Sequence, residues 1–350
     1  EPLESWRIFF LDRYQELASR MSNPSDPLEA AKLINEDLKQ LFGFDPRYYC
    51  HPTDQGLTEM LENNLGRCED MTNIAIYAFR ANGLPLTSDY TPHWADTSNN
   101  HAWNALITPS GEAIPMMGCE ANPGEYSLRP IIAKVYRKTF SINEDNLIFQ
   151  LKQGEKAPPW LSGKNYCDVT NLYVATHDIN LQVDPLFSDE DSFIYLCVFN
   201  SGEWKAIHWA ELQNGKAKFT KMGTEICYLP MFYREEQLQP ATIPFILRAD
   251  GELDWIEASS IKDDLLLVSV TKKIIQASTD DKIVSSLQKD SEYELFYWND
   301  RWESLGKRTA DEKPLKYERV PGTALYWLVQ CNSNKEERIF TYENNTQIWW

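Results

Sequence analysis

An internal repeat in the C-terminal half constrains the fold of this chain more than any other feature. The segments YLCVFNSGEW and YELFYWNDRW begin two copies that align at a constant offset of 98 residues, the separation of Trp204 from Trp302. Both copies consist of short β-branched and aromatic runs between Asn, Asp, Gly and Lys turns, a pattern typical of strands. A repeat of this length and texture predicts two tandem β-sandwich modules. The same offset aligns further aromatic residues: Tyr195 with Tyr293, Phe199 with Tyr297, Phe219 with Tyr317 and Tyr228 with Tyr326.

The N-terminal third carries a helical pattern instead. Apolar spacing predicts helices over residues 4–21 and 27–42, and Ser25 or Asp26 would cap the second, with Pro27 in its first turn. A third helix is predicted to begin at Cys68 and to end before Gly83. Its apolar face repeats at helical spacing: Met71, Ile74, Ala75, Ala78 and Phe79. We therefore expect a helical layer before the β-rich region, which begins at about residue 130.

Cys68, in Gly-Arg-Cys-Glu-Asp, stands in the first turn of that predicted helix. The unpaired backbone N–H groups and the dipole of a helix N-terminus favour a thiolate, which is the reactive form of cysteine. A free cysteine is more often a small buried hydrophobe, so Cys68 by itself would indicate only core packing. His101, in Asn-His-Ala-Trp-Asn, supplies a matching base further along the chain. Together the two residues predict a nucleophile and its general base.

A hairpin following His101 suggests a third member. Residues 102–107 and 113–117 have strand character, and Pro-Ser-Gly-Glu lies between them. If Ser110 and Gly111 are the two central turn residues, His101 lies directly opposite Glu120. Opposite residues share a face, with Cβ atoms roughly 4.5–5.5 Å apart. Glu120 is therefore predicted to accept the second imidazole N–H and to orient the ring. A register shift of one residue would turn Glu120 to the other face.

Residues 25–130 resemble the transglutaminase-like superfamily. The resemblance rests on GRCEDMTNIAIYAFRANGLP, then DYTPHWADTSNNHAWNAL, then an acid after a hairpin, in the order Cys, His, acid. It implies a papain-like α+β core and acyl transfer from a carboxamide through a thioester. The usual third residue of this family is Asp, whereas the matching position here holds Glu120.

This resemblance and the repeat together predict the domain organisation. We expect an α+β papain- or transglutaminase-like core followed by two all-β sandwich modules. The predicted domains are residues 1–135, 136–245 and 246–350. A connecting segment around KQGEKAPPWLSGK and the Pro-containing stretch LQPATIP would introduce the two modules.

The resemblance also implies residues around the reacting atoms. The backbone N–H of Cys68 offers one donor to a developing oxyanion, and a second is needed. Gln55 occupies the stretch upstream of the nucleophile where related sequences often carry a polar amide or an aromatic residue, so it is the candidate for that donor. His93 and Trp94 are alternatives for it. With Trp103, they are also the candidates for lining the substrate groove.

Several other functions have no support in the sequence. The Cys and His residues lack the short spacing of structural zinc ligands, apart from the neighbours Cys50 and His51, and no phosphate-binding or dinucleotide-binding glycine motif occurs. We therefore expect neither a metal nor a cofactor. A formal net charge of −18 disfavours nucleic acid and anionic membranes as partners. No apolar run approaches the ~20 residues of a membrane-spanning helix. Glu1 suggests a processed or trimmed start, and the resemblance implies a periplasmic or secreted location.

The first expectation for function is hydrolysis of a peptide or other amide by Cys68, His101 and Glu120. The substrate would be a peptide, protein or glycopeptide. Protein crosslinking by transamidation is the second expectation, since no separate amine site is recognisable. The third is an inactive envelope protein that binds peptide or glycan. An open groove beside the thiol would favour catalysis, and a blocked thiol would favour binding.

Overall fold

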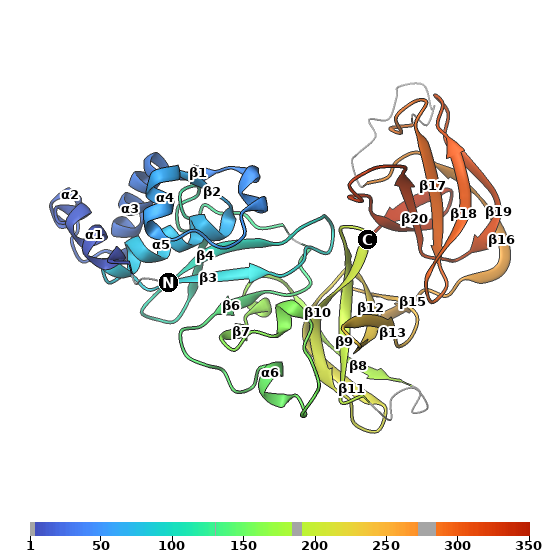
Figure 1. Ribbon diagram of the computed structural model, residues 1–350, viewed down its shortest axis with the longest axis horizontal. Helices are drawn as coiled ribbons and strands as arrows, with labels where there is room; N and C mark the ends of the chain where they lie inside the picture. The colour runs from blue at the N-terminus through green and yellow to red at the C-terminus, as the bar shows by residue number, and fades with distance from the viewer. Residues whose placement is uncertain (1–3, 130, 184–190, 272–284) are drawn as a thin grey trace.

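The computed structural model describes residues 4–129, 131–183, 191–271 and 285–350. These residues form three parts that follow one another along the long axis (Figure 1). An α+β core is followed by two antiparallel β modules, as the predicted fold class requires. The first module lies between the core and the second module.

The sheet of the core contains five antiparallel strands in the order β5-β4-β3-β6-β7. It extends beyond the predicted domain boundary at residue 135, because β6 pairs with β3 and β7 pairs with β6. The predicted boundary is therefore wrong, and the core continues to Asp168. The strands are β3 (Leu86–Thr91), β4 (His101–Ile107), β5 (Ala113–Met116), β6 (Tyr136–Lys138) and β7 (Tyr166–Asp168).

Helices cover one side of this sheet, and α5 packs directly against β3 and β4. The helix predicted over residues 4–21 is two short helices, because the chain turns at Tyr14, whose buried hydroxyl donates to the Ile34 carbonyl. The next helix begins as predicted, with Asp26 accepting from the Leu28 N–H at 2.9 Å. The elements are α1 (Trp6–Arg13), α2 (Leu17–Arg20), α3 (Pro27–Leu41), β1 (Gly43–Phe44), η1 (Pro46–Cys50), α4 (Leu57–Asn63), β2 (Leu65–Gly66) and α5 (Cys68–Ala81).

A connecting segment with short helical turns joins the core strands β6 and β7. Its turn η2 carries Trp160, which is 38% exposed and lies near the core residues Tyr90 and His93. The connecting segment contains α6 (Leu147–Gln150) and η2 (Pro159–Leu161), and η3 (Thr170–Leu172) follows β7 on the way to the first β module.

The first β module packs one sheet of six strands over a pair of strands, β8 and β11. Its central strand β9 is buried along its whole length, because its two faces enter two different cores. Ile194, Leu196 and Val198 face the core inside the module, while Tyr195 and Phe199 face the neighbouring parts. The strands are β8 (Thr176–Gln182), β9 (Phe193–Asn200), β10 (Glu203–Glu211), β11 (Lys216–Gly223), β12 (Ile226–Arg234), β13 (Gln237–Pro240), β14 (Phe245–Leu247) and β15 (Leu253–Trp255).

The second β module repeats this arrangement, with five strands in the order β18-β17-β20-β21-β22 beside the pair β16 and β19. Because β14 and β15 still pair with the first module, the boundary predicted at residue 245 lies too early. The strands are β16 (Ser259–Leu267), β17 (Glu292–Trp298), β18 (Trp302–Thr309), β19 (Leu315–Gly322), β20 (Tyr326–Gln330), β21 (Ile339–Glu343) and β22 (Thr346–Trp349).

Hydrogen bonds at equivalent positions show the repeat in atomic detail. The buried Tyr228 hydroxyl donates to the Gly223 carbonyl, and its counterpart Tyr326 donates to the Pro321 carbonyl. Lys221 and Arg319 both have positive φ, and each backbone N–H donates to an Asp of the strand paired with its own, β8 for Lys221 and β16 for Arg319. The offset seen in the sequence therefore aligns backbone conformation as well as residue type.

All three parts meet at one buried junction, where an aromatic cluster and an arginine connect them. Arg338 is 3% exposed and donates to backbone carbonyls of the core, of the first module and of the second, namely those of Ala95, Phe199 and Trp350. Among the described residues, no carboxylate forms an ion pair with this guanidinium, whose charge is compensated by those carbonyl dipoles. This junction positions the first module's sheet beside the core.

Candidate active site

Cys68 is the first residue of α5, as predicted. The Asp70 carboxylate accepts the Arg67 N–H at 3.0 Å, which fixes the chain at the helix start, and it also accepts the Gln55 N–H at 2.9 Å. No hydrogen bond occupies the Cys68 backbone N–H within the described part of the chain. That N–H is therefore free to act as a donor.

The thiol of Cys68 is held in its protonated form. It is 1% exposed and donates to the Glu69 carboxylate at 3.1 Å. Burial and then the negative charge of Glu69 raise the pKa of Cys68 to about 12, against its ordinary value of 9.0. The Ala102 backbone N–H and the Tyr49 hydroxyl favour the thiolate, but they do not outweigh those two effects. The neighbouring carboxylate thus opposes the helix-terminus effect on which the sequence argument depended.

His101 is the first residue of β4, next to the Ala102 N–H that acts on the thiol. Its ring stacks between Trp94 and Trp103, with centroid distances of 5.8 and 5.9 Å. Burial, and then the positive charge of Arg129, lower the pKa of His101 to about 4 from its ordinary 6.5. At neutral pH the imidazole is therefore uncharged and can accept a proton.

Tyr126, and not Glu120, is hydrogen-bonded to His101, with 2.6 Å between the tyrosine hydroxyl and Nε2. The hairpin register differs from the prediction by one residue, because Asn104 pairs with Met116 and the loop is centred on Ser110. Gly111 adopts positive φ, which permits this three-residue loop.

Glu120 follows the end of the ladder, in a tight turn closed by hydrogen bonds to the Met117 carbonyl, and it is exposed. Within the described residues no hydrogen bond joins it to His101. Its charge acts on Tyr126 instead, where burial first and Glu120 second raise the pKa of the phenol above its usual value. The predicted direct contact of Glu120 with His101 is therefore corrected to an indirect one through Tyr126.

Gln55 does not point a free amide at the reaction centre. It is 2% exposed, and its amide N–H groups donate to the Leu65 carbonyl and to Asp70, while its oxygen accepts from Asn63. These bonds brace the start of α5 and leave no donor for an oxyanion. The prediction for Gln55 is corrected accordingly, since its amide is already saturated by the helix cap. The Tyr49 hydroxyl, by contrast, interacts with the Cys68 thiol.

A cavity of about 410 Å³ lies beside the buried thiol, and we call it the Cys68 cavity. Glu69, Asn100 and Ala102 form the part next to the nucleophile, and Asn100 donates to Glu69 at 3.1 Å. Cys68 itself is covered, so a substrate reaches the sulfur only after a side chain moves. The full lining is Tyr49, Asp54, Arg67, Glu69, Tyr90, Asn100, Ala102, Lys138 and Trp160.

The three predicted groove residues occupy different environments. His93 lines a second cavity, next to Trp160 at a centroid distance of 6.0 Å. Trp94 is 8% exposed and packs on His101. Trp103 is fully buried beneath the same ring, so it supports His101 and is not a groove residue. This correction arises because β4 is a central strand and both its faces are covered.

Sequence analysis did not identify Tyr49, Glu69 or Tyr126 as site residues. Glu69 had a visible signal, since it directly follows the nucleophile. Tyr49 comes from a short 3-10 turn and Tyr126 from a loop beyond the hairpin, and neither position has a periodic pattern. Among the described residues, no group of three or more His, Cys, Asp or Glu side chains is arranged to hold a metal ion.

Residues 15–116 match the family model of the transglutaminase-like superfamily, which confirms the resemblance for this part of the chain. No curated protein matches the sequence. A proposed cysteine protease from Cytophaga hutchinsonii is similar in structure at 17% identity and a TM-score of 0.24, over 35% of this chain and 44% of that one. Red sea bream transglutaminase is similar at 8% identity and a TM-score of 0.27, over 98% of this chain and 72% of that one.

The alignment thus spans less than half of the Cytophaga protein. At these TM-scores neither likeness bears on the function of this chain. The match supports a thiol-dependent enzyme as the general class. In the described part of the chain, no helix is both long and apolar enough to cross a membrane.

Proposed function

We propose that this protein is a thiol-dependent amide hydrolase, with Cys68 as nucleophile and His101 as general base and acid. The observation that carries the proposal is the arrangement of a helix-N-terminal thiol, a neutral imidazole on the adjacent strand and a cavity beside them. A peptide or protein carboxamide is the proposed substrate, as expected for the superfamily that residues 15–116 match.

In the first half-reaction, His101 takes the thiol proton while Sγ bonds to the amide carbon. This order suits a thiol whose pKa is raised and an imidazole that is neutral, because little thiolate exists before substrate binds. The Cys68 N–H and the Tyr49 hydroxyl are the proposed donors to the oxyanion. Collapse of the tetrahedral intermediate breaks the C–N bond, and the imidazolium returns its proton to the leaving amine.

In the second half-reaction, water attacks the thioester while His101 accepts one of its protons. The C–S bond breaks, the carboxylic acid leaves, and the sulfur regains its proton. Tyr126 is proposed as a positioning residue whose hydroxyl oxygen accepts a hydrogen bond from the Nε2–H and leaves Nδ1 as the base facing the sulfur. A phenol oxygen is a weaker acceptor than a carboxylate, so it would stabilise the imidazolium less than an Asp would.

Turnover of a defined peptide mixture tests this function. The protein is incubated with a tryptic digest of casein, with and without added glycine ethyl ester, and new amino groups, ammonia and mass changes are measured. Hydrolysis predicts products without the added amine and an acyl adduct on Cys68. Cys68→Ala should abolish turnover, and His101→Ala should reduce it strongly. Products that form only with the added amine would show transamidation instead.

A binding function is the second candidate, because the Cys68 sulfur is covered and protonated. It predicts that peptides bind without any acyl adduct, and that Cys68→Ala binds them as the wild type does. Finding binding but no turnover in both digest conditions would replace the hydrolase proposal with this one.

A further inference from the structure

A large aromatic groove lies where the three parts meet, outside the Cys68 cavity. Its volume is about 770 Å³, which is within the range of ligand-binding pockets. Side chains of the connecting segment, of the first module's sheet and of the hairpin between β17 and β18 form its walls. We call it the indole groove and define it by Trp160, Trp204, Tyr233, Trp298 and Trp302.

Indole rings in edge-to-face contact form one wall of this groove. The rings of Trp204 and Trp298 meet edge to face at 5.5 Å, and those of Trp298 and Trp302 at 5.1 Å. Each of these three indoles has a buried N–H without a hydrogen-bond partner in the described part of the chain. The buried N–H of Trp103 in the core also lacks a partner among the described residues, so these donors do not distinguish a binding groove from a packed cluster. The groove is marked instead by its volume and by the indole rings that line it.

The indole groove adjoins the proposed catalytic region. Trp160 lines both the groove and the Cys68 cavity. Its ring lies 5.8 Å from that of Tyr90, which lines the Cys68 cavity, and 6.0 Å from that of His93, which lines the groove. A molecule whose amide lies beside Cys68 can therefore extend past Trp160 into the groove.

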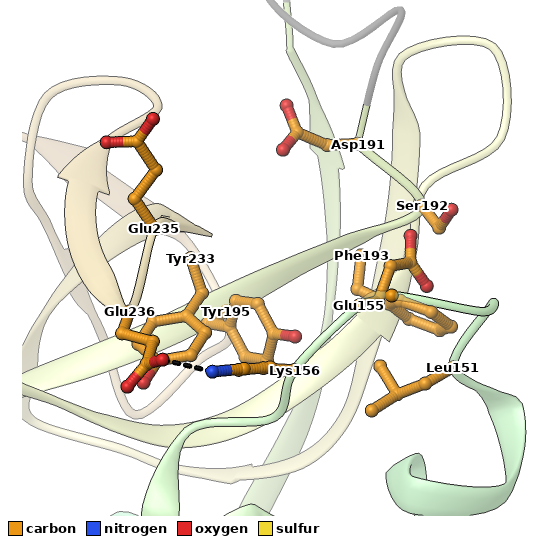
Figure 2. A pocket seen from close by; sticks show the side chains of 11 residues that line it. Leu151, Glu155, Lys156, Asp191, Ser192, Phe193, Tyr195, Tyr233, Glu235 and Glu236 are labelled. Carbon is orange, nitrogen blue, oxygen red and sulfur yellow. Dashed lines mark hydrogen bonds and ion pairs between the residues drawn. The ribbon is translucent and has the colours of Figure 1, made fainter.

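The opposite end of the groove leads to an acidic pocket of about 270 Å³, shown in Figure 2. Tyr233 and Glu236 line both cavities. Glu236 is paired with Lys156, as Figure 2 shows, and Asp191 is paired with Arg234. Glu155 and Glu235 also line the pocket, and neither has an ion-pair partner among the described residues. This end therefore favours a cationic group.

Two strand edges along the groove indicate what kind of chain would fit. β10 pairs only with β9, and β13 pairs only with β12, within the described residues. Residues of both strands line the groove, including Lys205 and Leu238. Unpaired backbone groups at a sheet edge can hydrogen-bond to an extended peptide, which favours a peptide over a sugar.

We propose that the indole groove binds an extended segment of the polypeptide substrate, with an aromatic side chain against Trp160 and Trp302 and a basic residue beyond it at Glu235. This inference rests on the proposed function and specifies its substrate. It makes the β modules a substrate-recognition surface for the core.

Direct binding to the Cys68→Ala protein tests the proposal without requiring turnover. The probes are fluorescein-labelled synthetic peptides that are identical except for Phe or Ala at one position and Lys or Glu at a later one. Fluorescence anisotropy should give about tenfold weaker binding when Phe becomes Ala, because an apolar side chain loses its burial. Replacing Lys by Glu should also weaken binding, and Glu235→Gln should reduce this charge preference.

Variants of tryptophans inside and outside the groove show where on the protein the peptide binds. Trp302→Ala should weaken binding of the Phe peptide about tenfold, and Trp302→Phe should weaken it much less. Trp255→Ala, which removes a 45%-exposed indole outside the groove, should have no effect. Equal loss in the Trp302 and Trp255 variants would overturn the proposal, as would binding of chitin oligosaccharides in competition with the peptides. Circular dichroism shows whether the Trp302→Ala protein is folded. If it is misfolded, binding of the peptide pairs to Trp302→Phe tests the proposal instead.

Turnover separates this inference from the proposed function. In a protein with Cys68 intact, Trp302→Ala should raise KM for the longer Phe peptide by a larger factor than KM for a short amide that does not reach the groove. Peptide binding without any turnover would contradict only the hydrolase. Turnover that is indifferent to the Phe and Lys positions would contradict only the groove.

Discussion

The Cys68 cavity and the indole groove differ in how ready each is to receive a ligand. The cavity is smaller and does not expose the sulfur, and burial and then the Glu69 charge raise the pKa of that thiol. The groove is larger and has an accessible indole at Trp160. Under the proposed function, binding energy would come from the open groove, while the reaction would take place at a site that is closed at rest.

This difference suggests how the two regions cooperate. Energy from remote parts of a substrate can offset the cost of opening and desolvating a reaction centre, so that distant contacts raise the rate. In this molecule the connection runs through Trp160, which belongs to both cavities. The Cys68 cavity, with a covered and protonated thiol and a neutral His101, can be tested separately from the open groove.

Loss of the base should have the largest effect. His101→Ala should reduce kcat/KM about 10²- to 10⁴-fold, because general-base catalysis contributes that much and the resting thiol is protonated. Turnover of the casein digest measures it. In the wild type, activity should fall as pH decreases through about 4, where His101 becomes protonated. A fall near the ordinary value of 6.5 would show that His101 is less buried in solution.

Removal of the neighbouring carboxylate should activate the thiol. Glu69→Gln deletes a negative charge that raises the pKa of Cys68, so the pKa should fall and more thiolate should form at about pH 8. We expect about tenfold faster alkylation of Cys68 by iodoacetamide. Mass spectrometry follows the site, and the exposed Cys50 serves as a standard within each sample.

The exposed Glu62, changed to Gln, controls for a general loss of negative charge. If Cys68 in the wild type already reacts as fast as Cys50, the closed and protonated resting state is wrong. If Glu69→Gln leaves alkylation unchanged, burial alone sets the thiol pKa.

Loss of the Tyr126 hydroxyl should have a moderate effect. Tyr126→Phe removes the partner of His101 Nε2, and a neutral hydrogen bond contributes about 0.5–1.5 kcal/mol, so kcat should fall about three- to tenfold. KM should stay constant, because the residue orients His101 and does not bind substrate. Tyr77→Phe removes a hydroxyl from the same core as the control. A change confined to KM would indicate substrate contact instead of positioning.

The sequence predicted those parts of the fold and site that depend on local patterns. Apolar spacing located α5 and placed Cys68 in its first turn, and the constant offset located equivalent strands of both β modules. The hairpin register could not be obtained in this way, because Pro-Ser-Gly permits a two-residue or a three-residue loop. The positive φ of Gly111 selects the longer loop and moves every later partner by one residue.

Partners from irregular segments were also inaccessible to pattern analysis. Tyr126 reaches His101 from a loop, and Tyr49 reaches the thiol from a 3-10 turn. Gln55 has a chemically suitable amide, but the cap of α5 already uses it. Residue type therefore indicated the chemistry, while tertiary packing decided which side chains were available for it.

The smallest expected effect belongs to Glu120, the residue that the sequence placed against His101. Its carboxylate is exposed and acts on His101 only through Tyr126, and exposed charges contribute about 0–1 kcal/mol. Glu120→Gln should therefore change kcat by about twofold or less, and in the Tyr126→Phe background it should change nothing further. Steady-state kinetics of the two single variants and the double variant measure this coupling. If Glu120→Gln lowers kcat as much as Tyr126→Phe does, and lowers it further in the double variant, Glu120 acts directly on His101. The residues around Cys68 would then be fully organised before substrate binds, and the Cys68 cavity would differ less from the indole groove in its readiness for a ligand.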